Sequence, residues 1–300
     1  MVGVSERPDI AIVGPGRVGT ALGVAAARAG YRVVGVAGRD EGRARAAAER
    51  IGPNVAYGPA ERIARGAALV LLTVSDDAIA GVCRQLAAAA VPAPGAVIAH
   101  CSGALGSEVL ASARQLAGAA IGSMHPLQTF PDPEAGAERL AGAYFFCEGD
   151  DRAVAVLTAL AEAVGGTAVR IDSQAKLLYH AAAVMACNGL AALLDAAFRT
   201  ARQAGIDPGL ARVAFGPLIR ATVDNVLAAG PAEALTGPIV RGDAALVGRE
   251  AGELSAADGR LGEIYRALGA WTVDLAVRKG SIDADQARAL LAALGGGETG

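Results

Sequence analysis

The sequence predicts an α/β protein in which a doubly wound, mostly parallel sheet is followed by an all-helical domain. From Asp9 to Ile171, short runs rich in β-branched residues alternate with longer segments rich in Ala, Leu and Arg. This alternation is typical of a parallel sheet with helices on both faces. After Asp172 only helical patterns follow. We therefore expect a sheet domain at 1–171 and a helical domain at 172–300, a division that the chain length also favours.

Each predicted strand is a short apolar run. In chain order these runs are "DIAIVG", "YRVVGVAG", "NVAYG", "AALVLLTV", "GAVIAH", "GAAIGSMH", "AYFFCEG" and "TAVRI", with helices between them. In the second domain the predicted helices are 173–204, one opened by Asp207-Pro208 and kinked at Gly216-Pro217, 253–279, and one opened by Asp283 with Gln286 in capping-box spacing.

Composition excludes several classes of function. The formal net charge is −3 and the chain has no block of consecutive Lys and Arg, which argues against a nucleic-acid partner. The four cysteines lack paired spacings, and the first residues lack a basic segment followed by an apolar core. We therefore expect a reduced, cytoplasmic protein. The spacings of His and Cys match no zinc pattern, so no metal is expected.

One segment resembles a membrane span in length. Leu177 to Leu194 has no formally charged residue over 18 positions, which is borderline for a bilayer. It contains His180 and Asn188 and lacks aromatic or basic anchors at its ends. We expect a helix buried within protein, with no membrane contact, and we expect it to form part of a homodimer interface because so apolar a surface is unfavourable in water.

The first strand leads into a glycine-rich turn. Gly14, Gly16 and Gly19 follow "IAIV" in G-x-G-x-x-G spacing and open a helix. In that context the glycines permit a tight turn, a close approach to a pyrophosphate and close packing of helix on strand. The unpaired N–H groups of the helix attract the anion. The residues expected to contact the dinucleotide are Gly14, Pro15, Gly16, Arg17, Val18, Gly19, Gly38, Arg39, Val74 and Ser75.

The end of the second predicted strand bears on the choice between NADP and NAD. It reads Gly38-Arg39-Asp40, and an arginine at this position pairs with the 2′-phosphate of NADP, whereas an acidic residue bonds the ribose of NAD. The strand ends at Gly38, so Arg39 is the first side chain in position and NADP is favoured. A shift of one residue would bring Asp40 into position and favour NAD.

Polar residues follow three other predicted strands, where a doubly wound sheet places its ligand. Ser75, Asp76 and Asp77 stand before a helix, where capping explains them. Ser102 with Gly103, and His125 with Pro126, are candidates for the site, although a structural role for each histidine stays open. Lys176 and His180 are four residues apart and share a helix face. Lys176 is the last charge before the uncharged segment, so we place its ammonium at the mouth of the site.

These motifs resemble a known family. "HCSGALG", "GSMHPLQTF", the Lys176 to His180 segment and "TGPIVRGD" resemble Rossmann-like oxidoreductases with a helical C-terminal domain of unknown function, within the 6-phosphogluconate dehydrogenase-like superfamily. The resemblance covers residues 9–294 and implies an NAD(P) domain followed by a helical domain that pairs with its copy in a dimer.

Neighbouring families imply roles for single residues. In β-hydroxyacid dehydrogenases and ketopantoate reductases a lysine that opens the first C-terminal helix exchanges a proton with the substrate oxygen, and Lys176 matches it. His180 replaces their asparagine, which is a departure. Ser102 and His125-Pro126 resemble the serine and His-Pro of prephenate dehydrogenases.

These features together predict an NADPH-dependent reductase of a small carbonyl acid, such as the 2-keto acid ketopantoate. Lys176 with His180 is expected to donate the proton, while Ser102, Gly103 and His125 hold the substrate. Arg241, in the loop "TGPIVRGD", is expected to bind its carboxylate, unless it forms a surface ion pair with Asp243. The alternative is a regulatory or sensor protein that binds NADP without turnover.

Overall fold

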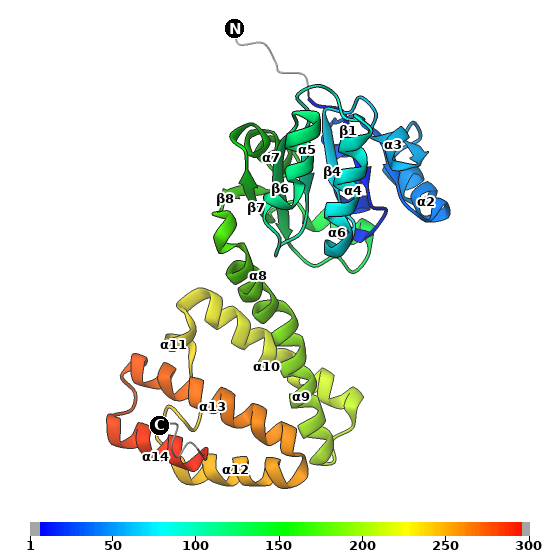
Figure 1. The fold of residues 1–300 in the computed structure, drawn as a ribbon. Helices are drawn as coiled ribbons and strands as arrows, with labels where there is room; N and C mark the ends of the chain where they lie inside the picture. Colours follow the sequence, from blue (N-terminus) through cyan, green and yellow to red (C-terminus); the bar gives the residue numbers. More distant parts are fainter. Residues whose placement is uncertain (1–6, 296–300) are drawn as a thin grey trace. The chain divides into compact units, whose positions relative to one another are not determined.

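The structure is a computed structural model that describes residues 7–295. It divides between Met185 and Ala186 into two compact units (Figure 1). Within the described residues, the first unit holds an eight-stranded sheet in the order β3-β2-β1-β4-β5-β6-β7-β8. The strands are β1 (Ile10–Val13), β2 (Val33–Ala37), β3 (Ala56–Gly58), β4 (Leu69–Leu72), β5 (Val97–His100), β6 (Ala120–Leu127), β7 (Tyr144–Gly149) and β8 (Thr167–Arg170).

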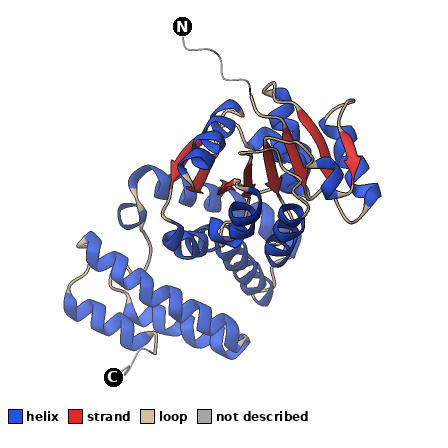
Figure 2. Ribbon diagram, turned by 45° about the horizontal axis from the view of Figure 1, so that its top comes forward, coloured by secondary structure: helices blue, strands red, loops and turns tan. Residues whose placement is uncertain are grey.

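All neighbouring strands are parallel except β6 and β7, which are antiparallel. Helices cover both faces of the sheet (Figure 2). Successive side chains of a strand point to opposite faces, so Ile10 and Ile12 join one core and Ala11 and Val13 the other. The predicted doubly wound, mostly parallel sheet followed by helices is confirmed.

Two groups of helices form these cores. One face packs under α1 (Arg17–Arg28), α2 (Glu41–Ile51), α6 (Pro133–Arg139) and α7 (Asp151–Ala163). The other packs under α3 (Ala60–Ile63), α4 (Asp76–Ala88), the short helix η1 (Ser107–Leu110) and α5 (Ala111–Ala117). The carboxyl ends of β1, β4, β5 and β6 therefore meet along one edge of the sheet.

The first unit extends beyond its last strand. β8 ends at Arg170, close to the boundary expected at 171, but the compact unit continues through η2 (Ser173–Ala175) and α8 (Lys176–Val184). Lys176 explains the difference, because its buried side chain bonds to groups on β6 and on the loop after β5.

The second unit is helical throughout its described elements. These are α9 (Leu190–Gln203), α10 (Pro208–Ala229), α11 (Pro231–Ala234), α12 (Ala244–Ala257), α13 (Gly259–Lys279) and α14 (Ala284–Ala293), preceded by a π-helical turn, η3 (Met185–Gly189). Asp207 caps α10 and Asp283 forms a capping box with Gln286, as predicted. The predicted helix 253–279 is wrong at its start. Asp258 leaves helical geometry and caps α13, which separates it from α12.

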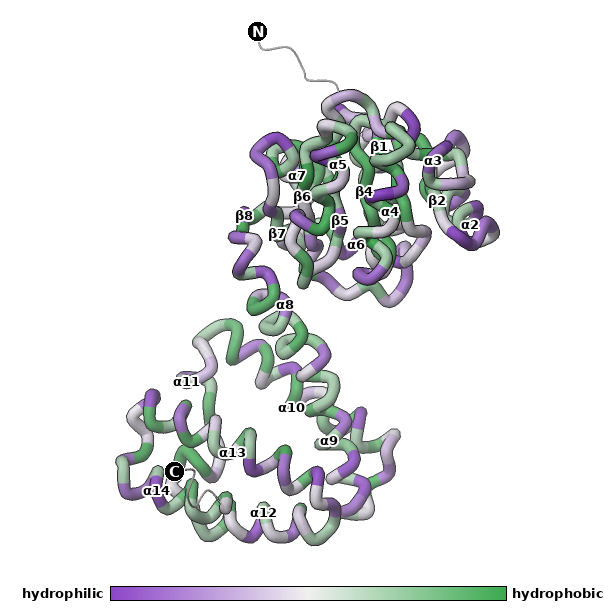
Figure 3. Tube along the Cα trace, in the orientation of Figure 1, coloured by the Kyte–Doolittle hydropathy of each residue, from purple (hydrophilic) through white to green (hydrophobic). Residues whose placement is uncertain are grey.

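The predicted burial of the uncharged helix is not met within one chain. In the continuous helix Ser173–Gln203 no residue of the most apolar window is buried, and its mean hydropathy is 1.7. Large apolar side chains are exposed on α8, η3, α9 and α10, and Figure 3 shows green, apolar stretches along α8 and α10. By length and composition alone this helix could also cross a membrane.

Candidate functional site

The glycine turn between β1 and α1 has the geometry that its sequence predicts. Gly14 has φ +124°, and a Cβ there would lie 2.5 Å from the carbonyl carbon of Thr73. A Cβ on Gly19 would meet the carbonyl oxygen of Gly14 and the Thr73 hydroxyl, each at 2.3 Å. At Gly16 the nearest atom would be 3.9 Å away. The turn is therefore closed toward the sheet and open above Gly16.

A cavity of about 620 Å³ lies beside this turn. The N-terminus of α1 has no side-chain cap and no acidic residue in its first turn, so its N–H groups suit an anion. These features fit the pyrophosphate of a dinucleotide. Of the cofactor residues expected from sequence, all but Arg17, Val18 and Gly19 line the cavity: Gly14, Pro15, Gly16, Gly38, Arg39, Val74 and Ser75.

The two residues Arg39 and Asp40, which follow β2, make different contacts. The side chain of Asp40 accepts a hydrogen bond from the N–H of Arg43 at 3.0 Å and so caps α2. Arg39 is exposed and lines the cavity, with Arg43 beside it. The cap occupies one oxygen of Asp40, whereas the Arg39 guanidinium makes no hydrogen bond to another described residue. Asp40 also lines the cavity, so both candidates for binding the adenosine ribose border it.

Ser102 joins the loop after β5 to the loop after β4. Its hydroxyl donates to the Asp76 carboxylate at 2.8 Å and accepts from the N–H groups of Ala104 and Leu105 at 3.2 and 3.1 Å. Asp76 follows Ser75, which lines the cavity. Asp76 therefore does more than face the dipole of α4, as capping alone predicted, because it connects the polar cluster to the cofactor cavity.

His100 has a structural role. It is fully buried, with Nδ1 accepting the Ser102 N–H at 3.2 Å and Nε2 3.2 Å from the carbonyl oxygen of Gly106. Its pKa is lowered to about 4, first by burial and then by the positive charge of Lys176. A neutral His100 thus fixes the 102–106 turn through both ring nitrogens.

His125, Tyr179 and His180 gather around Gly103. The Nδ1 atom of His125 lies 2.7 Å from the Tyr179 hydroxyl, and the two histidine ring centroids are 6.1 Å apart. A Cβ on Gly103 would lie 2.9 Å from Nε2 of His125 and 2.6 Å from the His180 ring. Glycine is therefore needed at 103, and Nε2 is the His125 nitrogen directed at this loop.

Burial perturbs both partners of the His125–Tyr179 contact. The pKa of His125 is lowered to about 4, first by burial, then by Lys176 and His180, while Asp76 opposes them. The pKa of Tyr179 is raised to about 12 by burial. At neutral pH the imidazole is uncharged and the phenol keeps its proton, so the phenol can donate to Nδ1 and leave the proton of His125 on Nε2.

Lys176 is buried instead of standing at the mouth of the site. It is 1% exposed, donates to the Ser102 carbonyl at 2.9 Å and to the Ser123 hydroxyl, and lies 3.7 Å from Glu148. These three neighbours match its three protons. Burial lowers its pKa and the Glu148 carboxylate opposes that change.

Sequence reasoning singled out neither Tyr179, which lies within an apolar helix, nor Glu148, which lies within a strand. A polar residue inside an apolar run was the only signal available for these two. Asp76 was assigned a capping role, and Ser123 lies beside the candidate His125. Their contacts with Ser102 and Lys176 join residues that are distant in the chain.

Two family models match the chain. Residues 4–126 match the family described as a Rossmann-like domain, and residues 143–272 match a domain of unknown function, DUF2520. The chain joins a Rossmann-like domain to a DUF2520 domain. Ser102 and His125 belong to the first match, and Lys176 and His180 to the second, so the polar cluster draws on both. No curated protein matches the chain.

Solved structures show the same fold. A Thermotoga maritima protein is 28% identical, with a TM-score of 0.69, and the match covers 90% of this chain and 99% of the other. A provisionally named NADP oxidoreductase from Bacteroides fragilis is 24% identical, with a TM-score of 0.70, covering 88% and 96%. A pyrroline-5-carboxylate reductase from Coxiella burnetii is 17% identical, with a TM-score of 0.57, covering 91% and 99%.

Arg241 lies in the DUF2520 domain and in the second compact unit. It is exposed, and Asp243 caps α12 by accepting from the N–H of Leu246 at 3.0 Å. Among the described residues Arg241 and Asp243 form no ion pair. The structure therefore does not support the alternative role of Arg241, a surface ion pair with Asp243. Its binding of a substrate carboxylate stays a prediction.

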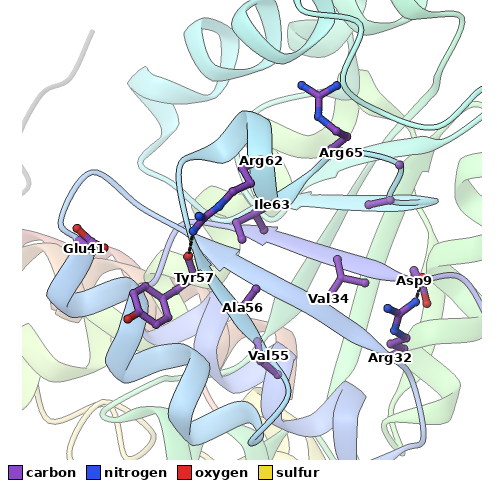
Figure 4. A pocket seen from close by; sticks show the side chains of 12 residues that line it. Asp9, Arg32, Val34, Glu41, Val55, Ala56, Tyr57, Arg62, Ile63 and Arg65 are labelled. Atoms are coloured by element: carbon purple, nitrogen blue, oxygen red, sulfur yellow. Dashed lines mark hydrogen bonds and ion pairs between the residues drawn. The ribbon is translucent and has the colours of Figure 1, made fainter.

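A second hollow, of about 810 Å³, lies at the opposite ends of the strands (Figure 4). It lies away from the carboxyl ends of the strands, where a doubly wound sheet places its ligand, and two of its arginines are engaged: Arg32 pairs with Asp9 at 2.7 Å and Arg62 donates to the Tyr57 carbonyl. It is therefore a poorer candidate than the glycine-turn cavity. Within residues 7–295 no group of three or more His, Cys, Asp or Glu could hold a metal ion.

Proposed function

We propose that the protein is an NADP-dependent oxidoreductase that reduces the carbonyl group of a small acid. The observation that carries the proposal is the Ser102–Asp76 hydrogen bond, which ties the His125 cluster to the loop that lines the cofactor cavity. The provisional name of the Bacteroides fragilis protein supports the same class. Ketopantoate gains no support from the comparisons, so the proposal concerns the class of substrate only.

The glycine turn would hold the pyrophosphate, and Arg39 would pair with the 2′-phosphate. The chemistry that a bound nicotinamide supplies is hydride transfer. His125 then gives the proton from Nε2 to the new alkoxide oxygen, while Nδ1 takes the Tyr179 proton. Tyr179 is half-buried, so the phenolate regains its proton from solvent. Ser102 and Gly103 hold the carbonyl, and Arg241 binds the carboxylate.

This proposal assigns the donation of the proton to His125, whereas the sequence analysis assigned it to Lys176 with His180. The reason is contact geometry: the Lys176 ammonium is buried and its neighbours are protein oxygens. Lys176 thus fixes the Ser102 loop, and His180 lines the site opposite Gly103.

The test is NADPH oxidation against a panel of 2-keto acids, other carbonyl acids and imines. With an identified substrate, His125→Asn should lower kcat by about 10²–10⁴, the usual range for a lost general acid, with NADPH affinity unchanged. Tyr179→Phe should lower kcat by about tenfold, because only the proton supply to Nδ1 is lost. Full turnover by His125→Asn would show that His125 is not the proton donor and would favour Lys176 in that role. NADPH binding without turnover across the panel would leave the sensor alternative.

We also propose a cytoplasmic homodimer in which a second copy covers α8, η3 and α9. Leu177, Leu178 and Met185 are 70%, 79% and 74% exposed, and a stable monomer rarely exposes so continuous an apolar surface. Light scattering should give twice the chain mass, and Leu178→Glu should reduce it, while Leu116→Glu, at an exposed position of the first unit, should not. A monomer at micromolar concentration would refute the dimer.

A further inference from the structure

Two charged side chains are buried together beside the candidate site. Among the Asp, Glu, Lys and Arg residues of 7–295, Lys176 and Glu148 are the two that are almost fully covered, at 1% and 3% exposure, and Nζ lies 3.7 Å from Oε1. Glu148 does not line the cofactor cavity. Its burial costs free energy that only its partners offset.

Those partners hold the carboxylate in one place. Ser107 donates its N–H to one oxygen of Glu148 and its hydroxyl to the other, each at 2.8 Å. Glu148 pairs with Ser123 across the antiparallel β6–β7 ladder, and Ser123 accepts from Lys176. The pair therefore joins η1, β6, β7 and α8 at a single point.

Lys176 is also a cation close to His125, because its ammonium bonds Ser123, which lies two residues before His125 on the same face of β6. The charged and titratable groups that face His125 are Lys176, Tyr179 and His180 from α8 and Asp76 from α4. Those that face Lys176 are Glu148 and Cys147 from β7, with His100 and Cys101 at the end of β5. A buried ammonium with no carboxylate would lose its proton, and its effect on the histidines would go with it.

We propose that Glu148 is a positioning residue that keeps the buried Lys176 charged and in place, and that this charge favours the neutral form of His125. The inference rests on the proposed function in one respect only, because the proposed proton transfer needs the neutral form of His125. A neutral His125 carries a proton on Nε2 while Nδ1 accepts from Tyr179, which is the form that the proposed proton transfer uses.

The composition of the chain makes a direct test practical. Lys176 and Lys279 are its only lysines, and His100, His125 and His180 its only histidines. Protein labelled with ¹³C-lysine and ¹³C-histidine therefore gives two lysine and three histidine side-chain signals, which can be followed by NMR across pH without substrate. Lys176→Met and His125→Asn assign the two signals of interest.

In the parent protein Lys176 should be charged at pH 7. Glu148→Gln should move its titration to lower pH by about one unit or more, and Glu148→Asp, which keeps the charge, should recover most of it. Lys176→Met should raise the His125 titration by about one unit, and so should Lys176→Met with Glu148→Gln, which leaves no unpaired buried charge. Glu108→Gln, at an exposed glutamate of η1, is the matched control and should change neither signal.

A neutral Lys176 at pH 7 in the parent would overturn the inference, and this outcome needs no variant. An unchanged Lys176 titration in Glu148→Gln, or an unchanged His125 titration in Lys176→Met, would also overturn it. The titrations do not depend on turnover. Failure of every substrate in the NADPH assay would thus count against the proposed function and leave this inference standing.

Discussion

The two ends of the candidate site are built on different principles. The cofactor end consists of backbone, with glycines whose missing side chains leave room and a helix N-terminus that needs no side-chain cap. The polar end consists of side chains that reach one another across the chain, such as Ser102 to Asp76 and Lys176 to Ser123, 26 and 53 residues apart. A backbone device is local and appears as a motif, whereas a side-chain network appears only after folding.

The largest combined effect, on stability and on cofactor binding together, is expected at the backbone end. Gly19→Ala would place a Cβ 2.3 Å from the Gly14 carbonyl oxygen, and overpacking against backbone costs about 1–3 kcal/mol. Unfolding by urea should show that loss, together with loss of NADPH binding by titration. Gly16→Ala, where space is open, should keep stability and weaken only NADPH binding. Equal destabilisation by both changes would show that the turn is not closed on the side of Gly19.

His100 should make the polar end sensitive to acid. Its folded pKa of about 4 lies below the ordinary value of 6.5, so the unfolded chain binds the proton first as pH falls. The stability that neutral His100 contributes is complete above pH 6.5 and is lost between pH 6.5 and 4, on the order of 3 kcal/mol. His100→Asn should flatten this part of the curve of unfolding free energy against pH. If the curve of His100→Asn ran parallel to that of the parent protein, the structural role of His100 would be contradicted.

Substitution of Arg39 should show how far cofactor preference at the backbone end depends on one side chain. NADPH should bind more tightly than NADH, and Arg39→Ala should remove most of that preference, about 1.5–3 kcal/mol or tenfold to a hundredfold. Arg28→Ala, at an exposed arginine in the last turn of α1, is the control. Equal affinity for both cofactors in the parent protein would contradict this role of Arg39 and would indicate that Asp40 bonds the ribose of NAD.

The smallest effect is expected at the bond between the two ends. Asp76→Asn keeps an acceptor for the Ser102 hydroxyl but removes the charge, at a cost of about 1 kcal/mol. We expect KM for the substrate to rise and NADPH affinity to stay constant, because Asp76 bonds Ser102. Asp151→Asn, at an exposed carboxylate in the first turn of α7, should alter neither constant. A change in both constants with Asp76→Asn would mean that Asp76 shapes the cofactor cavity as well.

Sequence and structure agree most closely where periodicity and local motifs decide the outcome. The strands, the glycine turn and the Asp207 and Asp283 caps each depend on a few adjacent residues. The break at Asp258 was missed because the helical pattern continues on both sides of it. Lys176 was placed at a helix start correctly, but its burial depends on Glu148, Ser123 and the Ser102 carbonyl, none of them near it in the chain.

The reversed direction of β7 has a consequence for how this chain can change in length. Because β7 runs against β6, Glu148 lies opposite Ser123 and Phe146 opposite His125, and Phe146 packs on Tyr179 with ring centroids 4.3 Å apart. A single-residue insertion in either strand would shift this register and turn Glu148 to the other face of the sheet. Insertions here should therefore be selected against, even though both strands lie outside the glycine motif, because a slipped strand would leave a buried ammonium without its carboxylate.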